Sequence, residues 1–137
     1  MNIVLLGAGA MGSLFGARLA QAGHAVTLVD IARAHLDAIA AHGLRLDSAA
    51  GSAQVPGLAV FEPKDWVGRV QAPGGRAPEL LIVFTKTLHT EAALRGVAGA
   101  IGPQTQVLSL QNGLGNVEKL AAVVDPARIL VLSLIHI

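Results

Sequence analysis

Three closely spaced glycines near the amino terminus form the pattern with the clearest chemistry in this sequence. The pattern G-x-G-x-x-G is made of Gly7, Ala8, Gly9, Ala10, Met11 and Gly12. Between a strand and a helix, Gly7 would make the tight turn. Gly9 would let main-chain atoms approach a ligand, and Gly12 would let the helix lie close to the strand. The N–H groups and positive dipole of a helix start attract phosphate. The glycines therefore predict a diphosphate site, with an unliganded glycine-rich turn as the alternative.

An acidic residue stands where a ribose would be recognised. Asp30 follows the apolar run 25–29, eighteen residues after Gly12. At the end of a second strand, its carboxylate can accept hydrogen bonds from the adenosine ribose hydroxyls of a dinucleotide. It would repel a 2′-phosphate by about 4 kcal/mol per pair of unit charges at an effective dielectric constant of about 20. Asp30 therefore favours NAD, although Arg33 could reach a 2′-phosphate. A helix-capping role for Asp30 is compatible with either cofactor.

Further polar groups follow two other apolar runs. Thr85 and Lys86 come directly after residues 80–84, where an ammonium group can hold a substrate carboxylate or a ribose oxygen. Asn112, in the stretch Q-N-G-L-G, offers both a donor and an acceptor at a turn. A solvent-facing lysine and a plain Asn-Gly turn are the alternatives, and these residues alone leave both interpretations open.

The pattern of apolar runs and helical periodicity predicts the elements that position these residues. Strands are expected at 2–6, 25–29, 80–84, 106–110 and 128–132, and helices at 10–22, 32–42, 91–101 and 117–124. Residues 44–47 and 54–61 are expected as short strands around a loop at 47–52, and 71–78 as an exposed loop. The alternation predicts an α/β fold, a Rossmann-type doubly wound parallel sheet that forms an NAD(P)-binding domain.

Composition and charge narrow the classes of function. The chain has 137 residues, the size of one compact domain, and its 53% hydrophobic content suits strands buried on both faces. A net charge of +1 and 3% aromatic residues argue against nucleic acid as a partner. The chain has no cysteine, and its five histidines lack metal-ligand spacing, so no metal is expected. Neither a nucleophile elbow nor a hydrolase-type carboxylate pair is found.

The location of the protein is also predicted from the sequence. The amino-terminal residues lack a cationic leader, and no apolar run reaches the roughly 18 residues of a membrane span. We expect a soluble, cytoplasmic protein with no membrane partner. Apolar surface left without contacts would favour self-association into an oligomer.

Three motifs, in this order and at these separations, resemble the ketopantoate reductase (2-dehydropantoate 2-reductase) family. They are N-I-V-L-L-G-A-G-A-M-G at the amino terminus, V-F-T-K ending in Lys86, and L-Q-N-G-L-G containing Asn112. The resemblance covers residues 1 to about 129. It implies reduction of the ketone of 2-dehydropantoate, a 2-keto acid, to pantoate, usually with NADPH, in pantothenate biosynthesis. It also implies that Lys86 contacts the cofactor near the nicotinamide, and that Asn112 touches both cofactor and substrate.

In this family a hydride passes from the nicotinamide to the keto carbon, and a lysine protonates the alkoxide. The resemblance implies that this lysine lies in a following helical domain. We therefore expect no catalytic residue in this chain, and cofactor binding with little or no turnover. Residues 1–132 would form the dinucleotide-binding domain. Residues 133–137 are expected to be a non-native tail, because the family continues into a Gly/Thr-containing turn there.

Two questions stay open on the sequence. The family commonly has a basic residue near the end of the second strand, where this chain has Asp30, so the choice between NADP and NAD is undecided. The alternatives to a ketopantoate reductase are a related 2-keto or 3-hydroxy acid dehydrogenase and a dinucleotide-sensing domain without catalysis. Lys86 and Asn112 favour an enzyme, since a sensor has no use for them.

Overall fold

The computed structural model describes residues 1–7, 9–48, 51–56, 58–84, 90–109 and 120–131. In these residues, six parallel strands form one sheet in the order β5-β2-β1-β6-β7-β8. The strands are β1 (Asn2–Leu6), β2 (Ala25–Val29), β5 (Ala59–Phe61), β6 (Leu80–Val83), β7 (Gln106–Ser109) and β8 (Ile129–Val131). The strand order reverses between β1 and β6, which is the doubly wound Rossmann arrangement and confirms the predicted fold.

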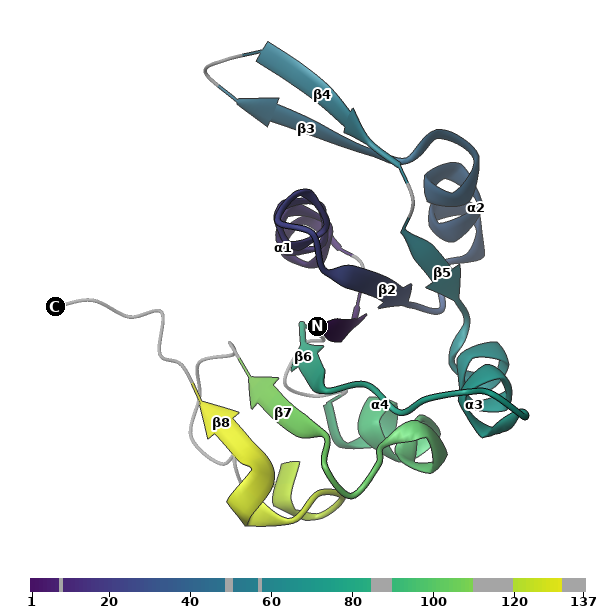
Figure 1. Cartoon of the computed structure of the whole chain (residues 1–137), viewed down its shortest axis with the longest axis vertical. Helices are drawn as coiled ribbons and strands as arrows, with labels where there is room; N and C mark the ends of the chain where they lie inside the picture. The colour runs from purple at the N-terminus through teal and green to yellow at the C-terminus, as the bar shows by residue number, and fades with distance from the viewer. Residues whose placement is uncertain (8, 49–50, 57, 85–89, 110–119, 132–137) are drawn as a thin grey trace, which may run out of the picture.

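Helices cover both faces of this sheet (Figure 1). They are α1 (Ala10–Gln21), α2 (Arg33–His42), α3 (Pro63–Gln71) and α4 (Thr90–Gly96). Helices α1 and α2 lie on one face, and α3 and α4 lie on the other. An antiparallel hairpin, β3 (Leu44–Ser48) and β4 (Gly51–Val55), projects from the face that carries α1 (Figure 1).

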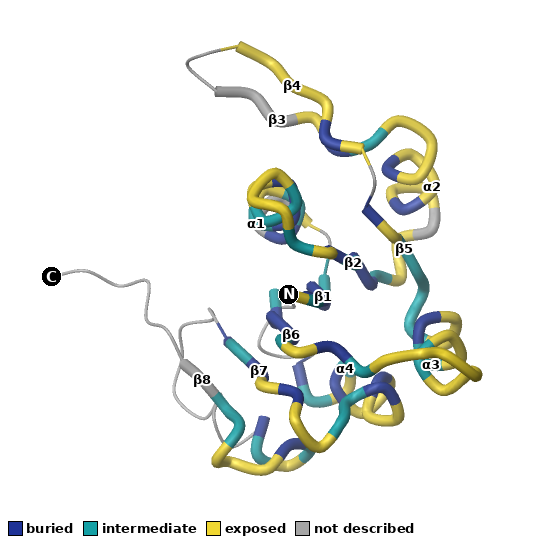
Figure 2. Tube along the Cα trace, in the orientation of Figure 1, coloured by how far each residue is buried: buried dark blue, intermediate teal, exposed yellow. Residues whose placement is uncertain are grey.

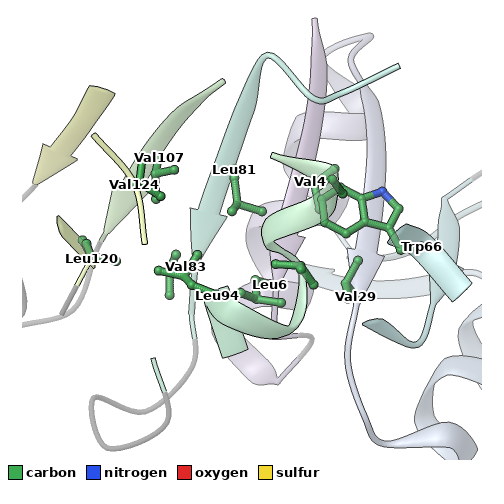
Figure 3. Packing of buried hydrophobic residues seen from close by; sticks show 12 residues of the cluster. Val4, Leu6, Val29, Trp66, Leu81, Val83, Leu94, Val107, Leu120 and Val124 are labelled. Carbon is green, nitrogen blue, oxygen red and sulfur yellow. The ribbon is translucent and has the colours of Figure 1, made fainter. Parts of the chain in front are cut away.

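The central strands are buried on both sides, so successive side chains of one strand enter different cores. In β1, Ile3 and Leu5 belong to the core under α1 and α2, whereas Val4 and Leu6 belong to the core under α3 and α4. Figure 2 shows this buried centre between exposed outer helix faces. Figure 3 shows the second core, in which the Trp66 indole of α3 lies beside Val4. The apolar runs of the sequence thus position the strand ends that carry the candidate site.

Most predicted elements are confirmed to within two residues, but one predicted strand is wrong. Residues 54–61 do not form a single strand, because β4 ends at Val55 and β5 begins at Ala59 in a different sheet. Pro56 has no N–H group to continue the β3–β4 ladder, which gives the physical reason for the break. The predicted loop at 47–52 is shorter in the structure, since β3 reaches Ser48 and β4 starts at Gly51.

Two helical regions also differ from the expectation. The predicted helix 91–101 is divided into α4 and a 3-10 turn, Ala98–Ala100, because Val97 between them adopts φ −117° and ψ 10°. Another 3-10 turn, Pro126–Arg128, precedes β8, and the Asp125 side chain caps it by accepting the Ala127 N–H at 3.0 Å. Strand β8 therefore starts one residue later than predicted.

Helix α3 was not predicted. Pro63 starts it, Asp65 lies in its first turn and Arg69 in its last turn, all in agreement with helix-end preferences. Trp66 anchors it in the core at 3% exposure. Residues 72–76 of the predicted exposed loop 71–78 are exposed, whereas Gln71 belongs to α3 and Pro78 is buried.

Some expectations fall on residues outside the described ranges. Residues 117–119 of the predicted helix 117–124 lie there. Of the remainder, only residues 120–121 are helical and a turn follows, although Leu120 and Val124 are buried in the core under α4. Residues 133–137 are also outside. Among the described residues, no helix combines the length and apolarity needed to cross a bilayer.

Candidate functional site

The glycine pattern forms the turn from β1 into α1, at the carboxyl edge of the parallel sheet. Gly7 has φ +103°, a conformation that side chains disfavour, and its N–H donates to the Val29 carbonyl at 2.8 Å. Gly9 is the N-cap of α1, and its carbonyl accepts the Ser13 N–H at 2.8 Å. Ala8 lies outside the described residues. The backbones of Ala10 and Met11 form the first helical turn, and their side chains are outside the description.

Gly12 lies in a closely packed environment, whereas Gly9 lies at an open surface. A Cβ on Gly12 would overlap the carbonyl oxygen of Gly7 and would also contact the Phe84 ring at 3.6 Å. A Cβ on Gly9 would meet nothing within 4 Å, and the φ of −67° at Gly9 suits any residue. The helix therefore needs a glycine at position 12 for its own packing. At position 9 the backbone leaves an open surface against which a ligand could lie.

The start of α1 is electrostatically suited to an anion. Within the described residues, no side chain caps this helix and no acidic residue lies in its first turn. The first N–H groups of a helix have no partner inside it, and the helix dipole places partial positive charge there. Phosphate oxygens can satisfy both, so this turn could hold a diphosphate.

Asp30 lies beside the glycine turn at the same edge of the sheet. The last residues of their strands, Leu6 and Val29, are paired in the parallel register. The Asp30 side chain is half-buried, and its Oδ1 accepts the N–H groups of Ile31 at 2.6 Å and Ala32 at 3.1 Å. Ala32 is the N-cap of α2, so Asp30 orders the start of that helix, the alternative considered for it. These two hydrogen bonds hold the Asp30 carboxylate in a fixed position.

The other predicted site residues lie outside the described ranges. Thr85, Lys86 and Asn112 belong to segments for which the structure gives no description. The strands that lead to these segments end level with the glycine turn, since Val83 of β6 pairs with both Leu6 and Ser109. Arg33 is the first residue of α2, and its side chain is also outside the description.

A cavity of about 740 Å³ opens next to Gly9, between α1, α2 and the β3–β4 hairpin. The Ser13 hydroxyl of α1 lies 3.5 Å from His35 Nε2 of α2 across this cavity. Two histidines, His35 and His42, and one arginine, Arg45, line it, and no acidic residue is found among its described lining residues. The cavity thus adjoins the start of α1 and, like it, has no acidic side chain that would repel an anion among the described residues.

Sequence reasoning missed two apolar residues at this site. Ile31 follows Asp30 and exposes 82% of its surface, which offers a flat apolar contact beside the carboxylate. The Phe84 ring lies next to Gly12 of the glycine turn, and its centroid is 5.3 Å from that of Phe15 in α1. A large aliphatic residue in a polar loop, and an aromatic residue at the end of a buried strand, are the signals that could have indicated them. No group of metal-ligating side chains is found in the described ranges.

Comparisons with known proteins agree with this geometry. Residues 3–136 match the family model described as ketopantoate reductase PanE/ApbA. A 2-dehydropantoate 2-reductase from Pyrococcus horikoshii is 41% identical over 120 residues, which cover 88% of this chain and 36% of that relative. This chain thus spans about a third of the length of the curated relatives it matches.

Solved structures show the same likeness. A complex of D-mandelate dehydrogenase with NADH and anilino(oxo)acetate has a TM-score of 0.83 and 30% identity, over 97% of this chain and 40% of that one. A PanE/ApbA family ketopantoate reductase from Ralstonia eutropha has a TM-score of 0.77 and 32% identity, over 97% and 40% of the two chains. The fold, the glycine turn and these matches together show that the chain belongs to the ketopantoate reductase family of oxidoreductases, whose amino-terminal domain it matches.

Proposed function

We propose that this chain binds a nicotinamide dinucleotide with its pyrophosphate on the first turn of α1. The observation that carries the proposal is the contrast between the two glycines of the turn. Gly12 is required by the packing of the helix, whereas Gly9 faces open space that a Cβ would fill. The uncapped helix start and the Arg45 guanidinium in the lining of the adjacent cavity supply the positive potential that a diphosphate needs.

A substitution at Gly9 tests this proposal. Gly9→Val places a branched side chain where the pyrophosphate would lie, and the backbone angles at Gly9 permit it. We expect NADH affinity, followed by nicotinamide fluorescence, to fall more than about tenfold, which corresponds to a loss of roughly 1.4 kcal/mol. The cost to helix capping should be below about 1 kcal/mol, so the variant stays folded.

The matched variant is Gly68→Val. Gly68 lies in α3, on the other face of the sheet, and a Cβ there also meets nothing within 4 Å. It should bind NADH as the parent does. If Gly9→Val bound NADH with unchanged affinity, or if the folded parent bound neither NADH nor NADPH, the proposal would be wrong.

We further propose that the chain prefers NAD to NADP. The carboxylate of Asp30 is fixed by two backbone N–H groups, at a place where it can accept the ribose hydroxyls and repel a 2′-phosphate. The exposed Ile31 side chain beside it can pack against the adenine. The likeness to a D-mandelate dehydrogenase solved with NADH supports this choice. Parallel titrations with NADH and NADPH test it, and tighter binding of NADPH would contradict it.

The reaction we propose is the reduction of a 2-keto acid, with 2-dehydropantoate as the first candidate because the curated relatives carry that activity. A bound dihydronicotinamide supplies the hydride. The residues of this chain bind and orient: the first turn of α1 holds the diphosphate and Asp30 the ribose. Lys86 and Asn112 are proposed to contact cofactor and substrate. Because the chain spans 36% of its Pyrococcus relative, we expect it alone to bind cofactor with little turnover.

An NAD-dependent 2-hydroxy acid dehydrogenase is the second candidate. It is favoured by Asp30 and by the structural likeness to D-mandelate dehydrogenase. Titration of the chain–NADH complex with ketopantoate and with benzoylformate, followed by nicotinamide fluorescence, separates the two. A response to ketopantoate alone supports the first candidate, and a response to benzoylformate alone supports the second. Rapid oxidation of NADH by the chain in either mixture would contradict the expected low turnover.

A further inference from the structure

A second cavity, of about 340 Å³, lies on the sheet face opposite α1. It is enclosed by β1, β2, β5, α3 and the loop that follows α3. Its lining includes the buried side chains of Val4 and Trp66, which lie side by side in Figure 3, and the half-buried side chains of Phe61 and Val70. Thr27 of β2 adds a half-buried polar side chain, and two arginines, Arg69 and Arg76, complete the lining. The cavity therefore combines an aromatic interior with a cationic mouth.

Two glycines bring the arginines to the same cavity. Arg69 is in the last turn of α3, and a tight turn follows in which the Gly75 N–H donates to the Ala72 carbonyl at 2.8 Å. Gly74 adopts φ +82°, and a Cβ on Gly75 would overlap the carbonyl oxygen of Arg69. The chain can fold back onto the helix end only with glycines at these places, and this fold-back places Arg76 beside the cavity.

The charge at this mouth is not neutralised by the described part of the protein. Neither guanidinium group makes an ion pair or a side-chain hydrogen bond within the described residues, and no acidic residue is among those that line the cavity. Glu79 is close in the chain, but its Oε1 accepts the Asn2 N–H at 2.9 Å. Their N–H donors can therefore bind a planar carboxylate through paired hydrogen bonds.

The size and lining of the cavity indicate the kind of molecule that fits. Ligand pockets in proteins have volumes of about 300 to 1,000 Å³, so this cavity suits a small compound. We propose that it binds a small carboxylate with an apolar body, whose carboxylate group contacts Arg69 and Arg76 and whose body packs against the half-buried side chains of Phe61 and Val70. The Thr27 hydroxyl can hydrogen-bond the ligand at the sheet.

This cavity does not share residues with the glycine turn. Val4 and Thr27 face the α3 side of the sheet, whereas Ile3 and Leu5 face α1. The carboxylate and a dinucleotide can therefore be bound together. For the same reason, each of the two proposals can fail without the other.

Trp66 provides the measurement, because it is the single tryptophan of the chain and lines the cavity. The folded 137-residue chain is titrated with cyclohexanecarboxylate, with the neutral analogue cyclohexanemethanol, and with inorganic phosphate. We expect a saturable change in Trp66 fluorescence with the carboxylate, and weaker or no saturation with the other two probes. Arg69→Gln and Arg76→Gln should each weaken carboxylate binding up to about fivefold, the size of a solvent-exposed charge contact, and the double variant should weaken it more.

Arg18→Gln is the matched control, since Arg18 is an exposed arginine in the last turn of α1, on the other face of the sheet. It removes the same charge and should leave carboxylate affinity unchanged. Three results would overturn the inference: no saturation up to the solubility limit of the probe, equal binding of the alcohol or phosphate, or equal weakening by Arg18→Gln. An NADH titration of the same samples shows whether the dinucleotide proposal holds independently.

Discussion

The backbone of Gly12 in α1 packs directly on the carbonyl oxygen of Gly7, with no room between them for a methyl group. This contact fixes the distance between the end of β1 and the first turn of the helix. It lets the first turn of the helix, with its N–H groups, lie close to the carboxyl end of β1.

Gly12→Ala should therefore damage both folding and cofactor binding. The added methyl group must displace the Gly7 backbone, and forced overpacking of this kind costs about 1–3 kcal/mol. Urea denaturation followed by Trp66 fluorescence measures the loss. The control is Gly16→Ala, whose methyl group would meet the Leu28 Cδ2 atom at 3.1 Å, a flexible side-chain end that can move. Equal stability of the two variants would contradict the assigned packing role of Gly12.

Ile31→Arg should change the cofactor preference. Ile31 exposes 82% of its surface, so the substitution costs the fold little. A guanidinium group beside Asp30 can pair with a 2′-phosphate, and we expect NADPH affinity to rise up to about fivefold relative to that of NADH. The ratio of the two dissociation constants is the measurement. Ile31→Gln removes the apolar side chain without adding charge and should not raise NADPH affinity. A rise with both variants would show that charge is not the cause.

Thr105→Val should destabilise the turn before β7. Thr105 is 1% exposed, and its hydroxyl donates to the Pro78 carbonyl at 2.7 Å and accepts the Gly102 N–H at 3.0 Å. Valine keeps the shape but leaves both backbone groups without this partner, at a cost of about 1–3 kcal/mol. Thr105→Ser retains the hydroxyl and should retain most of the stability in urea denaturation. If the valine variant were as stable as the parent, the two hydrogen bonds would contribute nothing.

Trp66→Ala should be the most damaging of these changes. The Trp66 side chain is 3% exposed and fills the space between α3 and the sheet. Truncating a buried tryptophan costs about 3–5 kcal/mol, and Trp66→Phe should cost clearly less because it keeps an aromatic ring there. Thermal unfolding followed by circular dichroism measures both variants. A larger loss for phenylalanine than for alanine would contradict the packing assigned to Trp66.

The parts of the fold that follow from local pattern were predictable from the sequence. Strand β1 is an unbroken apolar run that ends in glycine, and α1 has helical spacing from Ala10 onward, so the glycine turn could be located between them. The role of each residue in this turn as a cofactor contact stays a prediction. The same holds for Lys86 and Asn112, which lie outside the described residues.

The parts that were missed depend on weaker or competing signals. Helix α3 has nine residues and one fully buried side chain, Trp66, so its periodicity is short. Its signals were the proline at its start and the opposite charges at its two ends. Pro56 was a local signal for the division between β4 and β5, whereas the sheet that each strand joins is a tertiary choice that local pattern does not reveal. The exposure of Ile31 was missed because an aliphatic residue next to a strand is more often buried.

Strand β5 has a consequence for the solubility of the domain. It forms one border of the six-stranded sheet and has only three residues, Ala59–Phe61. A border this short presents few main-chain donors and acceptors to a strand from another molecule. The border at β5 therefore offers little main chain for the edge-to-edge pairing of strands that leads to aggregation, although the central strands of the sheet are apolar.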